Sequence, residues 1–336
     1  MTRTTHIRGV LFIFVVLSIG ALMLLPFVGA PPVGFDVLLN PAGAGRAAVV
    51  YWHIRLPRCI MAFLAGAGLS AAGMVFQCLF QNALASPFTL GVTGGASFAA
   101  ALYVKVGLAF NLFAVTGLSL AAFVGALVAM ILVLGLSKSV KGEGPAHVLL
   151  AGLAVNFSFT GAISFVQYLS DYSGSFRIIR WLMGGLEVAG FESVVHLLPP
   201  VLIGIAATIY FMRELNLITT GEEVAMSRGV NVAGVKQILF VTTSLMVGGV
   251  VSFCGPIGFV GIMAPHIARL FVGSDHRYLI PASILFGGLF LTLSDTVARL
   301  VISPAELPVG VMTSLFGGPF FLWLLIRNRG RGTELG

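Results

Sequence analysis

The sequence predicts an all-α polytopic membrane protein with about ten transmembrane helices. Of its 336 residues, 58% are hydrophobic and only 9% are charged, whereas charged residues make up about 25% of ordinary soluble domains. The hydrophobic residues also gather into runs of about 20, the length that an α-helix needs to cross the ~30 Å hydrocarbon core of a membrane. A soluble fold of this size could not cover its surface with so few charges.

Ten apolar runs follow one another along the chain. They cover residues 10–30, 59–80, 91–110, 112–136, 146–169, 194–212, 234–253, 257–270, 279–301 and 308–326. Nine are long enough to cross a membrane, and the first is expected to be an uncleaved span because it exceeds the apolar core of a signal peptide. The eighth is short and could be a buried span or a re-entrant segment. The runs leave no room for a soluble domain, so residues 1–336 are predicted to form a single transmembrane domain.

The basic residues predict the orientation. With ten spans and the N-terminus inside, the predicted cytoplasmic ends hold 12 of the 19 Lys and Arg residues, in agreement with the positive-inside rule. Both termini are then cytoplasmic. The basic residues form no block or stripe, so nucleic-acid binding is not expected. Cys59, Cys78 and Cys254 lie far apart without metal-ligand or redox spacing, and no metal site is predicted.

Motifs for nucleotide binding and catalysis are absent from the sequence. It contains no GxxxxGK[ST] loop, no HExxH and no GxSxG. We therefore expect no enzymatic activity and no cofactor in this chain. Among membrane proteins without these motifs, an ion-coupled secondary transporter or channel is one alternative. Such proteins usually place ionisable groups deep in the membrane, and the predicted spans hold almost none.

The segment between the sixth and seventh spans, residues 213–233, is predicted to form a rigid cytoplasmic knob. Thr220 and Glu223 have the spacing of a capping box at the start of a short helix. Gly229 is well placed to end that helix, and Asn231 to cap the next one. These local features fit both a well-capped connector and a docking element for a cytoplasmic partner.

Two spans carry patterns of small or polar side chains. In the second span, small residues at helical spacing predict close packing of helix backbones; they are Ala62, Gly66, Ser70 and Gly73. In the fifth span, polar residues recur along one stripe; they are Asn156, Thr160, Ser164 and Gln167. Because polar groups are costly in lipid, this stripe should face a neighbouring helix or a water-filled path.

Three arginines lie at the predicted outer ends of spans. Arg55 and Arg58 flank Leu56-Pro57, which places both guanidiniums near the water interface, and Arg299 follows Asp295 by four residues. They could be interface anchors, with an Asp295–Arg299 pair worth about 0.2–0.5 kcal/mol. They could instead bind carboxylates of a soluble partner, because arginine offers a planar bidentate fork.

Four segments carry a family resemblance. They are RLPRCIMAFLAGAGLSAAGMVFQCLFQNALASPFTLGVTGGA (55–96), RWLMGGL (180–186), GEEVAMSRGV (221–230) and GPIGFVGIMAPHIARLFVGSDHR (255–277). In this order, over essentially the whole chain, they resemble the FecCD-type permeases of bacterial ABC importers for iron-siderophores, haem and cobalamin. One departure is NALA at 82–85, where the family usually has NPLA, so a rigid turn residue is lost.

The resemblance implies a homodimer in the lipid of the bacterial inner membrane, with two cytoplasmic ATP-binding-cassette ATPase subunits below and an extracytoplasmic substrate-binding protein above. Alternating access, driven by hydrolysis of ATP that the partner binds with Mg²⁺, would carry a siderophore, haem or cobalamin-type substrate inward. The choice among these substrates does not follow from the sequence.

The resemblance also assigns roles to the motifs. It implies that a coupling helix contacts the ATPase through Gly221, Glu222, Glu223, Ala225, Arg228 and Gly229. Arg55, Arg58 and Arg299 match arginines that receive glutamates of the binding protein. The stripe of Asn156, Thr160, Ser164 and Gln167 matches a helix that borders the translocation path, with the tenth span as its companion.

Overall fold

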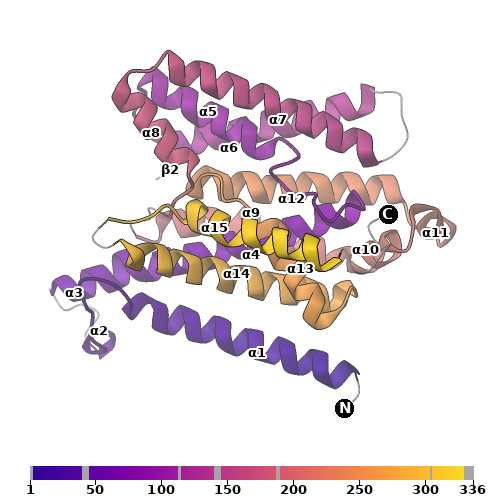
Figure 1. The fold of residues 1–336 in the computed structure, drawn as a ribbon, viewed down its shortest axis with the longest axis horizontal. Helices are drawn as coiled ribbons and strands as arrows, with labels where there is room; N and C mark the ends of the chain where they lie inside the picture. The colour runs from indigo at the N-terminus through magenta and orange to yellow at the C-terminus, as the bar shows by residue number, and fades with distance from the viewer. Residues whose placement is uncertain are drawn as a thin grey trace.

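The computed structural model describes residues 3–39, 45–112, 115–139, 145–186, 190–302 and 305–328. In this part of the chain the protein is almost entirely helical (Figure 1), which confirms the all-α prediction. Seven helices have the length and hydropathy of membrane spans, and α5, α13 and α15 are further apolar helices. The ten helices that match the ten predicted runs are α1 (Arg3–Leu24), α4 (Leu56–Leu79), α5 (Val92–Val106), α6 (Gly117–Ser139), α7 (Pro145–Tyr168), α9 (Glu192–Tyr210), α12 (Val232–Cys254), α13 (Val260–Val272), α14 (His276–Val301) and α15 (Val309–Asn328).

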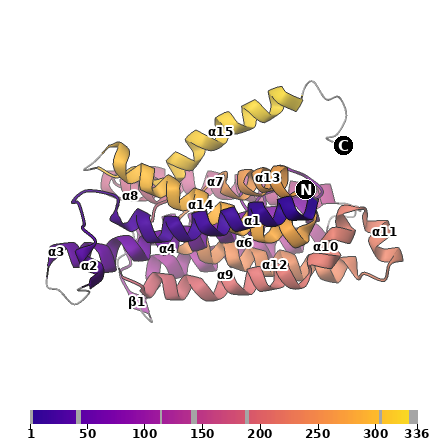
Figure 2. The same ribbon diagram turned by 90° about the horizontal axis from the view of Figure 1, so that it is seen from below.

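Short elements connect these helices at the two ends of the bundle. They are η1 (Leu25–Phe27), α2 (Asp36–Leu39), α3 (Arg46–Val49), η2 (Val50–Arg55), α8 (Tyr172–Leu182), α10 (Met212–Thr219), α11 (Glu222–Ser227) and an antiparallel hairpin of β1 (Asn111–Leu112) and β2 (Val115–Thr116). Both ribbon views place α2 and α3 at one end and α10 and α11 at the other (Figures 1 and 2). Helix α1 begins, and α15 ends, at the α11 end.

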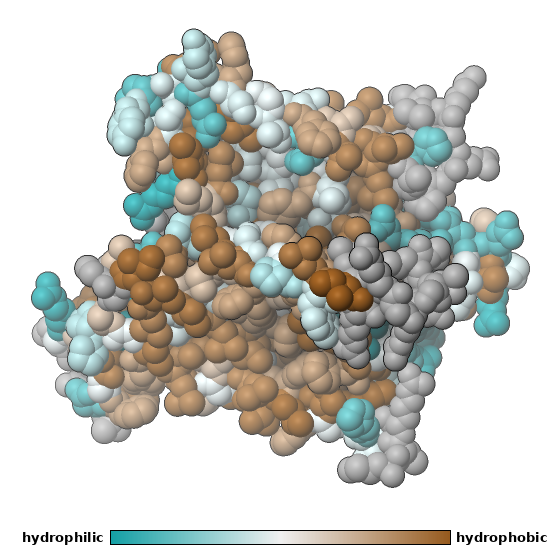
Figure 3. All heavy atoms as spheres, in the orientation of Figure 1, coloured by the Kyte–Doolittle hydropathy of each residue, from teal (hydrophilic) through white to brown (hydrophobic). Residues whose placement is uncertain are grey.

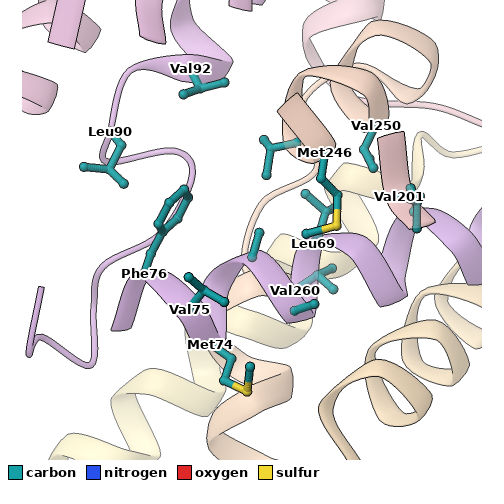
Figure 4. Close-up of a cluster of buried hydrophobic side chains, with 14 of the residues drawn as sticks. Leu69, Met74, Val75, Phe76, Leu90, Val92, Val201, Met246, Val250 and Val260 are labelled. Atoms are coloured by element: carbon teal, nitrogen blue, oxygen red, sulfur yellow. The ribbon is translucent and has the colours of Figure 1, made fainter. Parts of the chain in front are cut away.

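Helix α4 runs through the middle of the bundle, and nearly all of its residues are buried. Figure 4 shows Leu69 and Phe76 of this helix in a cluster with Met246 of α12, Val201 of α9 and Val260 of α13. Lipid tails are as apolar as these side chains, so dense packing rather than escape from water holds helices together in a membrane. The position of α4 therefore depends on how closely its neighbours fit.

Glycines allow that fit where helix backbones touch. A Cβ atom on Gly66 of α4 would overlap the carbonyl oxygen of Gly287 of α14, and one on Gly73 would overlap that of Gly261 of α13. Side chains larger than hydrogen are thus excluded at both crossings. This confirms the prediction that the small residues of the second span serve close helix packing.

The prediction of nine long spans is wrong at the third one. Helix α5 has only 15 residues, and at 1.5 Å per residue it is shorter than the hydrocarbon core. It ends at Gly107, whose φ of +72° is left-handed and whose amide donates to the Tyr103 carbonyl. Strand β1 then begins at Asn111, and Leu112, Val115 and Thr116 of the two strands lie at the start of the predicted fourth span.

Exposed apolar side chains cover the middle of the molecule, and hydrophilic residues gather toward its ends (Figure 3). Helix α15 diverges from the rest of the bundle (Figure 2), and its side chains Leu315, Leu322 and Ile326 are more than half exposed. An apolar band between polar ends is the surface that a membrane requires.

Candidate functional site

A cluster of charged side chains occupies the end of the bundle that holds α2 and α3. Arg58 lies in the first turn of α4 just after Pro57, and Asp295 lies near the end of α14, so the α4–α14 contact brings them together. The Arg58 guanidinium donates to Asp295 through Nε at 3.1 Å and Nη2 at 2.9 Å, and through Nη1 to Glu306 at 2.6 Å. Asp295 is 1% exposed, and Arg299 Nε lies 3.2 Å from its Oδ2. The predicted Asp295–Arg299 pair is confirmed as one part of a larger network.

Arg55 and Arg299 hold the loop after η1 through its backbone. Arg55 donates to the carbonyl oxygens of Pro31 at 2.7 Å and Phe27 at 3.5 Å, and Arg299 donates to that of Val28 at 3.4 Å. Gly29, with φ +138°, leaves the space for these guanidiniums, because a Cβ there would lie 3.1 Å from Arg55 Nη2.

The structure thus brings the three predicted arginines together, and it places Arg55 and Arg58, which were expected near the water interface, inside the protein. Both side chains are buried, at 4% and 8% exposure, because Asp295 and the loop carbonyls attract them inward. Glu306 was not predicted as a site residue, since nothing in the local sequence links it to Arg58, 248 residues away.

At the opposite end, α11 forms the predicted knob, but its start differs from the prediction. Gly221, with φ +129°, precedes the helix, and no side chain caps its first turn. The Thr220 hydroxyl instead donates to the Leu217 carbonyl of α10 at 2.7 Å. The prediction of a capping box at Thr220 and Glu223 is therefore wrong. Helix α10 continues to Thr219, and the Thr220 hydroxyl is hydrogen-bonded to the last turn of that helix.

The predicted end of α11 is confirmed. Gly229 has φ +82°, its amide donates to the Met226 carbonyl, and the amide of Val230 donates to that of Ala225. These two bonds form a Schellman motif, which satisfies carbonyls at a helix end. Asn231 then accepts from the amide of Gly234 at 3.0 Å and caps α12, as predicted.

The predicted coupling residues divide between the inside and the outside of the knob. Ala225 of α11 is fully buried, and Glu222 forms an ion pair with Lys236 of α12. Glu223 and Arg228 are exposed. Two apolar side chains that were not predicted as site residues, Val224 and Met226, are 42% and 55% exposed on the same helix. They are two residues apart in a six-residue helix, so the sequence shows no helical periodicity that would have predicted an exposed apolar face.

The polar stripe of α7 lies along a largely uncovered helix. Thr160 and Ser164 are exposed, and their hydroxyls donate to the carbonyls of Asn156 and Thr160, one turn earlier. Asn156 and Gln167 are half-buried, and Asn156 packs against Gly94 of α5, where a Cβ would lie 2.6 Å from its Oδ1. The hydroxyl pair therefore faces outward from this chain, while Asn156 contacts α5.

Metal-ligating side chains do not gather in the described ranges. There, no group of three or more His, Cys, Asp or Glu side chains is close enough to hold an ion. Cys59, Cys78 and Cys254 are buried and unpaired with one another. The polar chemistry of these ranges is concentrated in the arginine cluster and the knob.

Known proteins are similar to this chain in sequence and in fold. The profile of the FecCD transport family matches residues 10–327. The hemin transport system permease protein HmuU of Yersinia pestis is 35% identical over 95% of this chain and 94% of its own length. The cobalamin import system permease protein BtuC of Halobacterium salinarum is 40% identical over 83% of this chain and 74% of its own. A solved inward-facing structure of a metal-chelate type ABC transporter superposes with a TM-score of 0.82, at 28% identity, over 95% of this chain and 99% of that one. The chain therefore belongs to the FecCD transport family.

Proposed function

We propose that the protein is the membrane-spanning permease subunit of an ABC importer, which carries its substrate inward by alternating access. One observation carries the proposal: the α11 knob projects from the bundle at the end opposite the arginine cluster (Figures 1 and 2). A single chain thus offers separate attachment points on the two sides of a membrane. ATP hydrolysis would occur on two ATPase subunits that bind the α11 end, which places that end and both termini in the cytoplasm.

The exposed surface of α11 fits a protein partner. Val224 and Met226 provide apolar contact area, and Glu223 and Arg228 provide charges of both signs around it. Interfaces commonly combine an apolar centre with a polar rim. We assign the ATPase contact to these four side chains, with Gly221, Glu222, Ala225 and Gly229 shaping and supporting the helix.

The arginine cluster fits the docking of an acidic binding protein on the other side. Arg55, Arg58 and Arg299 place three positive charges within one small region, against the two carboxylates of Asp295 and Glu306. Glu306 is half exposed, so an incoming carboxylate could replace it on Arg58. We assign the docking of the substrate-binding protein to these three arginines.

A second copy of the chain would cover part of the exposed apolar surface. Helix α15 diverges from its own bundle with Leu315 and Leu322 exposed, and Phe157 and Phe165 are exposed on α7. A homodimer built on these helices would enclose a path along its two-fold axis. The stripe of α7, with Thr160 and Ser164, would border that path.

The substrate class follows from the named relatives, which transport hemin and cobalamin, and from the metal-chelate type transporter. We propose an iron chelate, haem or a cobalamin-type compound as the substrate, and the cytoplasmic (inner) membrane as the location.

Substitutions that change the charge and polarity of the exposed α11 surface test whether this surface binds the ATPase. The double variant Glu223→Arg with Met226→Glu should lose co-purification with the cognate ATPase, while the variant chain still folds in detergent because neither side chain is buried. Glu192→Arg, an exposed acid on the first turn of α9, is the matched control and should retain the ATPase. Full retention of the ATPase by the double variant would refute the coupling role of α11.

A further inference from the structure

One side chain at the base of the knob, Asn216 of α10, uses both ends of its amide to hold the start of α14. Its Oδ1 accepts from the backbone amide of His276 at 2.9 Å and lies 2.8 Å from Nδ1 of the same residue. Its Nδ2 donates to Asp275 Oδ1 at 2.9 Å. The backbone bond fixes Oδ1 as an acceptor, so the His276 ring donates from Nδ1.

These bonds close a small network. Asp275 caps α14 by accepting from the amide of Arg277 at 3.0 Å, and His276 is 3% exposed. Burial raises the pKa of Asp275, but the hydrogen bonds from Arg277 and Asn216 outweigh it and hold that pKa below its ordinary value. Asp275 is therefore a carboxylate at neutral pH and a strong acceptor for Asn216.

Helix α10 is also attached to α4. The thiol of Cys78, near the end of α4, lies 3.4 Å from the Leu215 carbonyl and 3.3 Å from the Thr219 hydroxyl. Helix α10, which leads into the α11 knob, is thus bound to both α4 and the start of α14 through side-chain contacts.

Helices α4 and α14 join the two ends of the molecule. Helix α14 runs for 26 residues from His276 to Val301, and its backbone touches that of α4 at Gly66 and Gly287. At the far end of the same pair, Asp295 binds Arg58. A displacement of α10 therefore reaches the arginine cluster through one packed pair of helices.

We propose that Asn216 is the positioning residue that transmits movement of the α11 knob to α14, and through α4 and α14 to the arginine cluster. This inference rests on the proposed function, because it assumes that an ATPase binds α11 and that a binding protein docks at the arginines. Coupling of two sites requires an element that both sites bias. The α4–α14 pair, bound to α10 at one end and holding Arg58 at the other, is such an element.

The test measures ATP hydrolysis of the reconstituted complex with and without the substrate-loaded binding protein. Asn216→Leu keeps the side-chain volume but removes all of these hydrogen bonds. It should keep the ATPase bound and the basal rate unchanged, and reduce stimulation by the binding protein about 10-fold. Thr242→Val, which removes a hydroxyl bonded only within α12, is the matched control and should change nothing.

Exchanging the Asn216 amide and the Asp275 carboxylate should restore stimulation of ATP hydrolysis. A merely structural role would not produce this rescue. Asn216→Asp places a carboxylate against that of Asp275 and should uncouple, and Asp275→Asn alone should weaken the cap. The double variant Asn216→Asp with Asp275→Asn restores a donor opposite an acceptor and should recover stimulation. Loss of stimulation in Asn216→Asp that the double variant does not recover would overturn the inference, as would normal stimulation in Asn216→Leu or in Asn216→Asp. The wild-type complex separates the two proposals: if it is not stimulated, the proposed function is wrong, whereas a stimulated wild type with a stimulated Asn216→Leu refutes only the role of Asn216.

Discussion

Arg58 shows how a residue expected at a surface becomes part of the interior. Its guanidinium forms a bidentate contact with Asp295 and a further bond to Glu306. The sequence placed Arg58 at the start of a span and paired Asp295 with Arg299, because both inferences need only local spacing. The contact between Arg58 and Asp295 joins residues 237 positions apart, and it depends on the packing of α4 against α14, which local spacing cannot predict.

Substitutions of Arg58 and of Glu306 show how much each side chain contributes to the stability of the fold. Arg58→Met leaves the buried Asp295 with only Arg299, and removal of one member of a buried ion pair costs about 3–5 kcal/mol. We expect a destabilisation near the lower end of that range, because Arg299 remains. Glu306→Gln removes a half-exposed partner and should cost about 1 kcal/mol or less.

Thermal unfolding of the detergent-solubilised variants, followed by tryptophan fluorescence, checks this order. Equal midpoints for Arg58→Met and Glu306→Gln would show that the Asp295 contact contributes little to stability.

At the scale of single elements, the sequence predicts helix ends where one residue has a specific conformational role. Gly229 ends α11 and Asn231 caps α12 because a left-handed φ and a short polar cap each favour particular residues. The start of α11 was misplaced because α10 is a separate helix that keeps the Thr220 hydroxyl. The amphipathic helix α8 was missed, although Asp171 at its start accepts from the amide of Gly174 in the manner of an N-cap.

The turn at residues 82–85 illustrates a substitution that local chemistry tolerates. The family resemblance led us to expect proline at the second position, where this chain has Ala83. The Asn82 side chain accepts from the amide of Leu84 at 2.8 Å, and its carbonyl accepts from that of Ala85 at 3.0 Å. Asparagine side chains stabilise turns in this way, so the turn is held without proline.

The crossing of α4 and α14 gives a prediction for helix packing. Gly66→Ala places a methyl group where the Gly287 carbonyl lies, so the helices must separate, and overpacking of this kind typically costs about 1–3 kcal/mol or more. Gly20→Ala on α1 meets no atom within 4 Å and should be neutral or slightly stabilising, since alanine favours helix. The midpoint of thermal unfolding in detergent measures both, and an unchanged midpoint for Gly66→Ala would contradict the close backbone contact.

At the scale of the whole molecule, composition predicted all ten apolar helices in order, because each helix within a membrane requires a run of apolar residues. Their arrangement was not predictable in the same way. Nothing in the run at 59–80 marks α4 as the buried centre, apart from its small residues, and nothing at 308–326 indicates that α15 diverges from the bundle. The stripe on α7 was predicted to face a neighbour or a path, and the structure leaves its Thr160 and Ser164 hydroxyls exposed.

The central claim is that this chain imports a chelate using ATP hydrolysed by a partner, and uptake into proteoliposomes tests it most directly. The purified chain is reconstituted alone or with its ATPase, and the loaded binding protein is added outside with labelled haem, ferric hydroxamate or cobalamin. We predict accumulation of one of these ligands only when the ATPase and enclosed ATP are both present, and none with an ATPase that cannot hydrolyse ATP. Accumulation by the chain alone, driven by an imposed ion gradient, would contradict the claim and identify a secondary transporter.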